Sequence, residues 1–279
     1  MTASDDADAC GPANADQRQL VSRDPWQSLR QFTSARIALG RSGSSLSTRD
    51  LLDFGLAHAQ ARDAVHLPLD VATLQSQLQA DGWDVIALGS RAADRAAYLA
   101  RPDWGRRLRE DARPLLDAAR AAASARVDAD GSTFDLVFVV SDGLSSTAVQ
   151  RHAAPLLQLL RPLRDGLRVA PIVVATQARV ALSDEVGQCL QARIAISLIG
   201  ERPGLSSPGS LGAYLTYAPR VGNTDEARNC ISNIRPQGLV LAEAAQQIAA
   251  LLRAALHAQR SGVALRYDPH ATGAIYQQV

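Results

Sequence analysis

A carboxylate and a guanidinium, Glu201 and Arg202, stand where an apolar segment of the sequence ends. Residues 194–199 form a short run rich in β-branched side chains, which predicts a buried strand. Proline and glycine in the following Gly200-Glu201-Arg202-Pro203-Gly204 favour a shaped loop over continuation of that strand. Ligands of open α/β sheets bind beyond the carboxyl ends of strands, so Glu201 is a candidate hydrogen-bond acceptor for a ligand. The alternative is a surface turn that carries a solvated ion pair.

A second candidate is an anion site at residues 141–147, Ser-Asp-Gly-Leu-Ser-Ser-Thr, between a predicted strand at 134–140 and a predicted helix. Free backbone N–H groups and the helix dipole attract anions at such a turn. The segment lacks the GxGxxG spacing, and an ordinary capped helix explains it equally well. The arginine-rich segment 101–108 fits a phosphate or partner site, or a solvated helix start. A stand-alone nucleotide- or phosphate-binding α/β module therefore stays open as an alternative function.

Composition excludes several kinds of chemistry. All 29 basic residues are arginines, so a lysine Schiff base and a Walker A loop are absent. The cysteines, Cys10, Cys189 and Cys230, are odd in number and far apart, which fits neither a disulfide framework nor a zinc cluster and predicts a reducing compartment. A net charge of +1 gives no reason to expect nucleic acid or a membrane surface as partner. No apolar run is long enough to cross a bilayer, and we expect a cytoplasmic protein.

The chain is expected to have a helical region followed by an α/β region. Residues 1–23 show little apolar periodicity and are predicted to be a flexible tail. Residues 24–126 carry mainly helical patterns that begin at Asp24-Pro25, with 85–88 fitting either a short strand or a loop. Strands and helices alternate over 127–265, which predicts a mostly parallel sheet covered by helices, with a polar, irregular stretch at 228–234. Residues 266–279 are expected to be a C-terminal tail.

Short segments that recur in order over residues 24–265 resemble one known family, the small subunit of ethanolamine ammonia-lyase. No segment is specific alone, but the ordered set is. The segments are Thr-Ser-Ala-Arg-Ile (33–37), Gly-Arg (40–41), Ala-Arg-Asp-Ala-Val (61–65), Arg-Pro-Asp-Trp-Gly-Arg-Arg-Leu (101–108), Ser-Asp-Gly-Leu-Ser (141–145), Gly-Glu-Arg-Pro-Gly-Leu (200–205), Tyr-Ala-Pro-Arg (217–220) and Cys-Ile-Ser-Asn-Ile (230–234).

The resemblance implies a fold, a reaction and a partner. Enzymes of this family convert ethanolamine to acetaldehyde and ammonia with adenosylcobalamin. Their large subunit, a (β/α)₈ barrel, holds the substrate and the radical chemistry. The small subunit has a helical N-terminal region and a Rossmann-like domain, and it closes over the cobalamin at the subunit interface. We therefore expect a hetero-oligomer with a large subunit, and no catalytic or metal-ligating residue in this chain.

The resemblance also implies three cofactor-binding residues, Val180, Glu201 and Cys230. Val180 and Glu201 follow the carboxyl ends of consecutive predicted strands, where the crevice of such a sheet opens. Glu201 is expected to accept a hydrogen bond from an amide or ribose hydroxyl of the corrinoid, and Val180 to offer an apolar wall. Cys230 would add a small, soft surface; a buried free cysteine is its alternative.

The segment Asp268-Pro269-His270-Ala271-Thr272-Gly273 fits the Asp-x-His-x-x-Gly pattern of a different cobalamin class. In that class the histidine replaces the cofactor's own base on cobalt, and a long domain follows the motif. Only six residues follow Gly273 here, so we interpret the match as chance and expect cobalamin to bind base-on. Some relatives enter a protein-shelled bacterial microcompartment through an amphipathic N-terminal helix, which residues 1–23 do not show. Cytosol is favoured, with the microcompartment left open.

Overall fold

The computed structural model describes residues 24–33, 35–123, 127–164 and 166–265. Both expected tails, and with them Cys10 and His270, lie outside these residues. The packing divides the chain into two units, residues 1–54 and 55–279, which are described separately. The domain boundary expected at residue 126 stays a prediction. Among the described residues, no helix combines the length and apolar character that crossing a bilayer requires.

The smaller unit begins with a 3-10 helix, Pro25–Phe32, and contains the short hairpin β1 (Arg41–Ser42) and β2 (Ser45–Leu46). As expected, Asp24 caps the first helix, accepting the N–H of Trp26 at 2.9 Å. The helix ends at Phe32, because Thr33 is already extended. The first turns of α1 (Thr48–His66) complete the unit.

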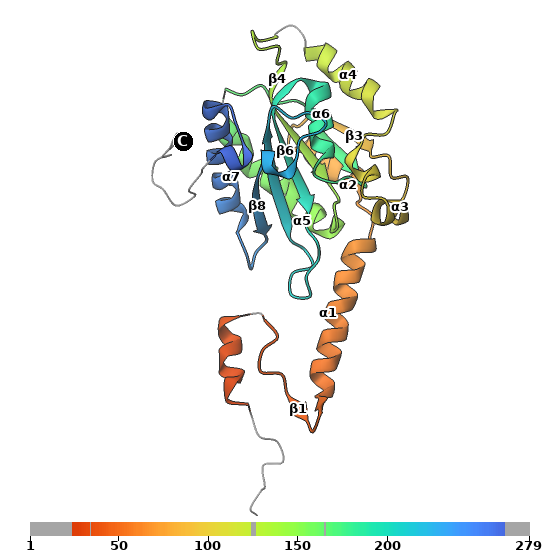
Figure 1. Ribbon diagram of the computed structural model, residues 1–279, viewed down its shortest axis with the longest axis vertical. Coiled ribbons are helices and arrows are strands. Elements are labelled where there is room, and N and C mark those ends of the chain that lie inside the picture. The colour runs from red at the N-terminus through yellow and green to blue at the C-terminus, as the bar shows by residue number, and fades with distance from the viewer. Residues whose placement is uncertain (1–23, 34, 124–126, 165, 266–279) are drawn as a thin grey trace, which may run out of the picture. The chain divides into compact units, whose positions relative to one another are not determined.

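The larger unit is built on a six-stranded sheet with the order β3-β5-β4-β6-β7-β8 (Figure 1). The strands are β3 (Val85–Gly89), β4 (Phe134–Ser141), β5 (Ile172–Thr176), β6 (Ala192–Gly200), β7 (Leu211–Tyr217) and β8 (Arg228–Ile234).

The sheet is mixed, with a parallel part as expected and an antiparallel part that the sequence did not indicate. β3, β5, β4 and β6 are parallel, whereas β7 and β8 are antiparallel to their neighbours. Parallel neighbours need a long crossover, usually a helix. The connections 201–210 and 218–227 contain no α-helix, so the chain turns back beside the strand it has just left.

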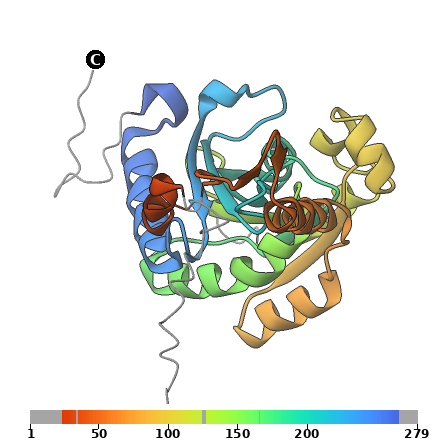
Figure 2. The same ribbon diagram turned by 90° about the horizontal axis from the view of Figure 1, so that it is seen from below.

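Helices cover both faces of the sheet (Figures 1 and 2). Successive residues of β4 face opposite sides: Leu136, Phe138 and Val140 pack with α2, α5 and α7, while Val137 and Val139 pack with α4 and α6. All eight residues of β4 are buried, as expected for a central strand. The helices are α2 (Val71–Ala80), α3 (Arg95–Ala100), α4 (Ala112–Ala123), α5 (Ser146–Leu160), α6 (Leu182–Leu190) and α7 (Leu241–Ala258).

The two edge strands are the elements that the sequence left undecided or mispredicted. Residues 85–89 form β3, with Val85 opposite Ile172 of β5. The stretch 228–234, expected to be irregular, is the strand β8. Its pattern is unusual because Arg228 is buried: its guanidinium donates to Asp184 of α6 at 2.7 Å, and both side chains are under 4% exposed. A buried ion pair thus replaces the apolar side chain that normally marks a strand.

Candidate functional site

A cavity of about 180 Å³ lies at the carboxyl ends of the parallel strands. Val180, in the loop after β5, and Glu201, directly after β6, both line it, so the structure brings two of the three predicted residues together. The other lining residues are Tyr98, Gly143, Leu144, Arg179, Ile199, Gly200, Arg202 and Tyr214.

The Glu201 side chain is fixed by the strands that follow it. Ser210 donates its hydroxyl to Oε2 at 2.6 Å, and the backbone N–H of Asn233 lies 3.2 Å from Oε1 and 3.3 Å from Oε2. The Glu201 N–H in turn donates to the Ser210 carbonyl at 2.9 Å. A carboxylate offers about four lone-pair sites, so these contacts hold it in place and leave capacity for a ligand donor.

Cys230 lies next to this cavity rather than in its lining. It is exposed on β8, directly opposite Tyr214 of β7, and its thiol forms a hydrogen bond with the Tyr214 hydroxyl. Partial burial raises the pKa of the Cys230 thiol, the Tyr214 hydrogen bond lowers it, and the Glu201 charge raises it further. Tyr214 therefore connects Cys230 with the cavity lined by Val180 and Glu201. Sequence reasoning missed Tyr214, because no local motif distinguishes it within β7.

Two glycines bring the β4–α5 turn against the end of β6. The N–H of Leu144 donates to the Gly200 carbonyl at 2.9 Å. A Cβ on Gly200 would overlap the carbonyl oxygens of Ser145 and Asp142, and Gly143 has a φ of +54°. Only glycine fits this close approach, which forms one wall of the cavity.

The same contacts favour the capped-helix interpretation of residues 141–147 over the anion site. The N–H groups of Leu144 and Ser145 are engaged by Gly200 and Asp142 carbonyls. Ser145 caps α5 by accepting the N–H of Ala148 at 3.3 Å, and its hydroxyl donates to the Pro208 carbonyl at 2.8 Å. These groups are therefore not directed at an open surface where a phosphate would bind.

The loop that carries Val180 is held by buried polar contacts. The carboxylate of Asp142 accepts the N–H groups of Gln177 at 3.0 Å and Ala178 at 3.2 Å. Burial raises the pKa of Asp142, although these hydrogen bonds and Arg95 act in the opposite direction. The guanidinium groups of Arg95 and Arg179 lie over the buried ring of Tyr98, 4.7 and 4.5 Å from its centroid.

The arginine-rich segment 101–108 makes internal ion pairs. Arg107 donates to both carboxylate oxygens of Glu185, at 2.9 and 3.2 Å, and Glu185 also accepts the Leu108 N–H at 2.9 Å. Arg101 pairs with Asp103 at 2.6 Å. These contacts favour a structural role for Arg101 and Arg107 over a phosphate site.

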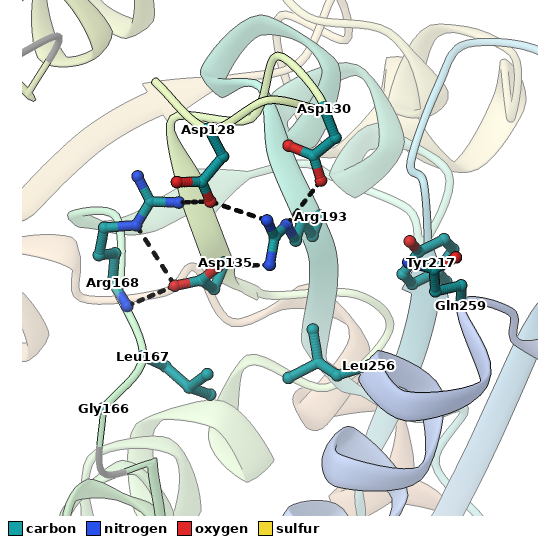
Figure 3. Close-up of a pocket in the computed structure, with 10 residues that line it drawn as sticks. All are labelled: Asp128, Asp130, Asp135, Gly166, Leu167, Arg168, Arg193, Tyr217, Leu256 and Gln259. Atoms are coloured by element: carbon teal, nitrogen blue, oxygen red, sulfur yellow. Dashed lines mark hydrogen bonds and ion pairs between the residues drawn. The ribbon is translucent and has the colours of Figure 1, made fainter. Parts of the chain in front are cut away.

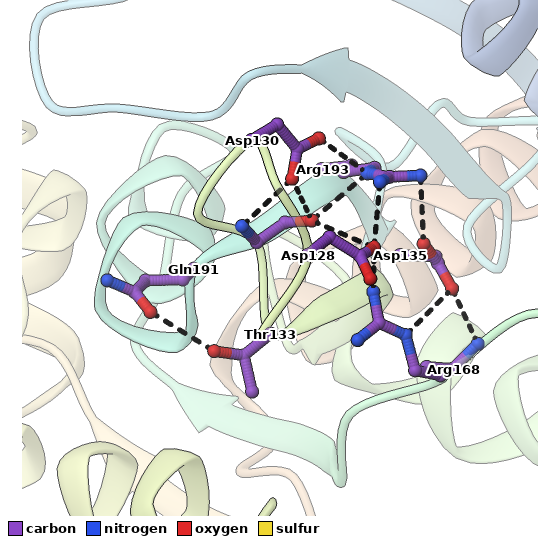
Figure 4. A network of polar contacts seen from close by, with 8 residues as sticks. Asp128, Asp130, Thr133, Asp135, Arg168, Gln191 and Arg193 are labelled. Carbon is purple, nitrogen blue, oxygen red and sulfur yellow. Dashed lines mark hydrogen bonds and ion pairs between the residues drawn. The ribbon is translucent and has the colours of Figure 1, made fainter. Parts of the chain in front are cut away.

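A larger cavity of about 400 Å³ lies at the opposite edge, near the amino ends of β4 and β6 (Figure 3). Its charged side chains pair with one another (Figure 4). Arg193 contacts Asp128 at 2.7 Å, Asp130 at 2.8 Å and Asp135 at 3.3 Å, and Arg168 pairs with Asp128 and Asp135. We interpret this cluster as a set of ion pairs that stabilises the amino ends of β4 and β6, and we call it the clasp. Elsewhere in the described part of the chain, too, no group of three or more His, Cys, Asp or Glu could hold a metal ion.

The fold and this site define an α/β protein that presents a small mixed polar and apolar cavity at the carboxyl ends of its parallel strands. Residues 23–266 match the family model described as ethanolamine ammonia-lyase light chain (EutC). The chain belongs to this family, as its ordered segments predicted.

Curated relatives are similar over nearly the whole chain. The ethanolamine ammonia-lyase small subunit of Ralstonia nicotianae is 54% identical over 256 residues, covering 90% of this chain and 91% of the relative. That of Xanthomonas campestris pv. campestris is 54% identical over 246 residues, 88% of each. That of Azotobacter vinelandii is 53% identical over 251 residues, covering 89% of this chain and 90% of the relative.

Proposed function

We propose that this small subunit binds adenosylcobalamin together with a large subunit, for the deamination of ethanolamine to acetaldehyde and ammonia. The observation that carries the proposal is the arrangement of Val180, Glu201 and Cys230. Two of them line one cavity, and the third lies beside it across Tyr214. Val180 and Glu201 come from beyond the carboxyl ends of parallel strands, where α/β proteins bind ligands, and Cys230 adjoins them from the edge strand β8.

The chemistry of these residues fits an edge of a corrinoid. The Glu201 carboxylate is oriented and retains acceptor capacity, which suits the amide side chains and ribose hydroxyl of the cofactor. Val180 and Leu144 supply apolar surface beside it. When bound, adenosylcobalamin supplies the radical chemistry, while the residues of this chain orient it and exclude water. The chain would act in the cytoplasm, either free or inside a bacterial microcompartment.

The size of the cavity supports shared binding. Pockets that enclose a drug-sized ligand are roughly 300–1,000 Å³, and cobalamin is larger than such ligands. The cavity here has about 180 Å³, which accommodates only one edge of the cofactor. The remaining cofactor surface needs a second wall, which we assign to the large subunit.

Exposed apolar side chains in the smaller unit also support a partner chain. Trp26 is 66% exposed, Phe32 78% and Leu52 67%. Large exposed apolar side chains of this kind are typical of protein–protein interfaces when they gather in patches. We propose that the large subunit covers them.

Glu201→Gln tests the assignment most simply, because it removes the charge and keeps the shape of the side chain. A lost charge-assisted hydrogen bond is worth roughly 1.5–3 kcal/mol, so we expect the apparent KM for adenosylcobalamin to rise about 10- to 150-fold. The KM for ethanolamine should change little. The matched control is Glu243→Gln, an exposed carboxylate on α7. Unchanged cofactor affinity with a lowered melting temperature would instead identify Glu201 as a loop-structuring residue.

A further inference from the structure

Tyr214 connects the proposed cofactor-binding residues. It lines the cavity with Val180 and Glu201, and it lies opposite Cys230 across the β7–β8 pair. Its side chain is only half-buried, so part of the ring faces the cavity. Tyr214 is therefore in contact with both the cavity and, across the strand pair, Cys230.

Gly212 brings Tyr214 and Glu201 close together. A Cβ on Gly212 would lie 3.0 Å from Oε1 of Glu201 and 3.2 Å from Cε2 of Tyr214, so both side chains flank the same glycine. Burial, Cys230 and Glu201 all raise the pKa of Tyr214 above its ordinary value. The phenol therefore stays protonated at neutral pH, which makes its hydrogen available to the Cys230 sulfur.

We propose that Tyr214 is a further cobalamin-binding residue, which also positions Cys230 through its hydroxyl; the inference rests on the proposed function. A phenol that donates its hydrogen to sulfur keeps lone pairs on its oxygen, and these accept an amide N–H from a corrinoid side chain. The ring face supplies apolar contact beside Val180. Glu201 and Tyr214 together then offer two acceptors to the amide-rich rim of the cofactor.

The test is equilibrium binding of hydroxocobalamin to the assembled large- and small-subunit complex, followed by absorbance. Tyr214→Phe removes only the hydroxyl and should raise the Kd roughly 3- to 10-fold, the effect of one lost hydrogen bond. Tyr217→Phe, at the last residue of β7, is the matched control and should bind like wild type. The penalty of Tyr214→Phe should shrink in a Cys230→Ala background, because the two side chains act as a pair.

A second measurement follows the pKa of the Cys230 thiol. Tyr214→Phe removes a hydrogen bond that lowers the pKa of Cys230, so the pH midpoint for alkylation of Cys230 should move upward. Should Tyr214→Phe fail to assemble, Cys230→Ser and Cys230→Ala carry the test. The serine keeps an acceptor for the phenol and should retain more cobalamin affinity than the alanine.

The outcomes separate this inference from the proposed function. If wild type binds hydroxocobalamin, Glu201→Gln weakens binding and Tyr214→Phe does not, the inference about Tyr214 is wrong and the proposed function stands. Equal affinities of Cys230→Ser and Cys230→Ala would also overturn it. If the wild-type complex binds no cobalamin, both are overturned.

Discussion

The side chains that we propose to bind the cofactor are each held by a second group. Ser210 and the Asn233 N–H fix Glu201, the Tyr214 hydroxyl contacts Cys230, and Asp142 anchors the loop that leads to Val180. Pre-organisation of this kind reduces the entropy lost when a ligand binds. We therefore expect substitutions of the supporting residues to weaken cofactor binding as well as substitutions of the contacts.

His270 provides a prediction about the cobalt ligand. A histidine that ligates cobalt needs a second residue to fix its ring, and we interpret the match at residues 268–273 as chance. We expect base-on cobalamin, and deletion of residues 266–279 should leave cofactor affinity largely intact. Electron paramagnetic resonance of the complex reconstituted with cob(II)alamin and ¹⁵N-histidine-labelled protein provides the measurement. Nitrogen splitting that changes with the label would show that the protein supplies the axial ligand.

At the level of elements, the site depends on the close packing of the β4–α5 turn against the end of β6. Gly200→Ala would place a Cβ against the Ser145 and Asp142 carbonyls, and the backbone would have to move. We expect a loss of about 1–3 kcal/mol in the free energy of unfolding, as for other overpacked sites. Urea denaturation measures it.

Gly55→Ala is the control for Gly200→Ala. Nothing lies within 4 Å of a Cβ built on Gly55, which is an exposed residue of α1. Alanine is favoured over glycine in a helix by roughly 0.5–1 kcal/mol, so this variant should be neutral or more stable. Equal losses for both variants would contradict the steric argument.

The clasp at the amino ends of β4 and β6 predicts an acid-sensitive contribution to stability. Hydrogen bonds from Ser132, with help from Arg193, lower the pKa of Asp130 from its ordinary 3.8 to about 2. A carboxyl whose pKa is lower in the folded state stabilises the fold above its unfolded pKa, and this contribution is lost as the pH falls from about 4 to 2. Asp130→Asn should therefore lose less stability over that interval than wild type does. Parallel acid profiles from urea denaturation would contradict the assignment.

The sequence predicts the central strands well and the edge strands poorly. β4, β5 and β6 contain apolar runs, and the positions of Val180 beyond β5 and Glu201 beyond β6 follow from these runs. β8 was missed because the buried Arg228 depends on Asp184, a partner 44 residues away. Without β8 the pairing of Cys230 with Tyr214 cannot be inferred, since cross-strand register is a long-range property. Tyr214 could therefore be recognised only from the structure.

At the level of the whole molecule, we propose that the chain provides only one part of a cofactor site. Its cavity at the carboxyl edge is too small to enclose cobalamin, and its smaller unit exposes large apolar side chains. The central claim is that the cofactor binds between this small subunit and a large one.

Titration of adenosylcobalamin into the separate small subunit, the separate large subunit and the assembled complex tests that claim most directly. Absorbance and calorimetry report binding, and acetaldehyde formation reports turnover. The account predicts stoichiometric binding and turnover by the complex, with weak binding and no turnover by the small subunit alone. Binding by the small subunit alone as tight as that of the complex, or a complex that Glu201→Gln leaves unaffected, would contradict it.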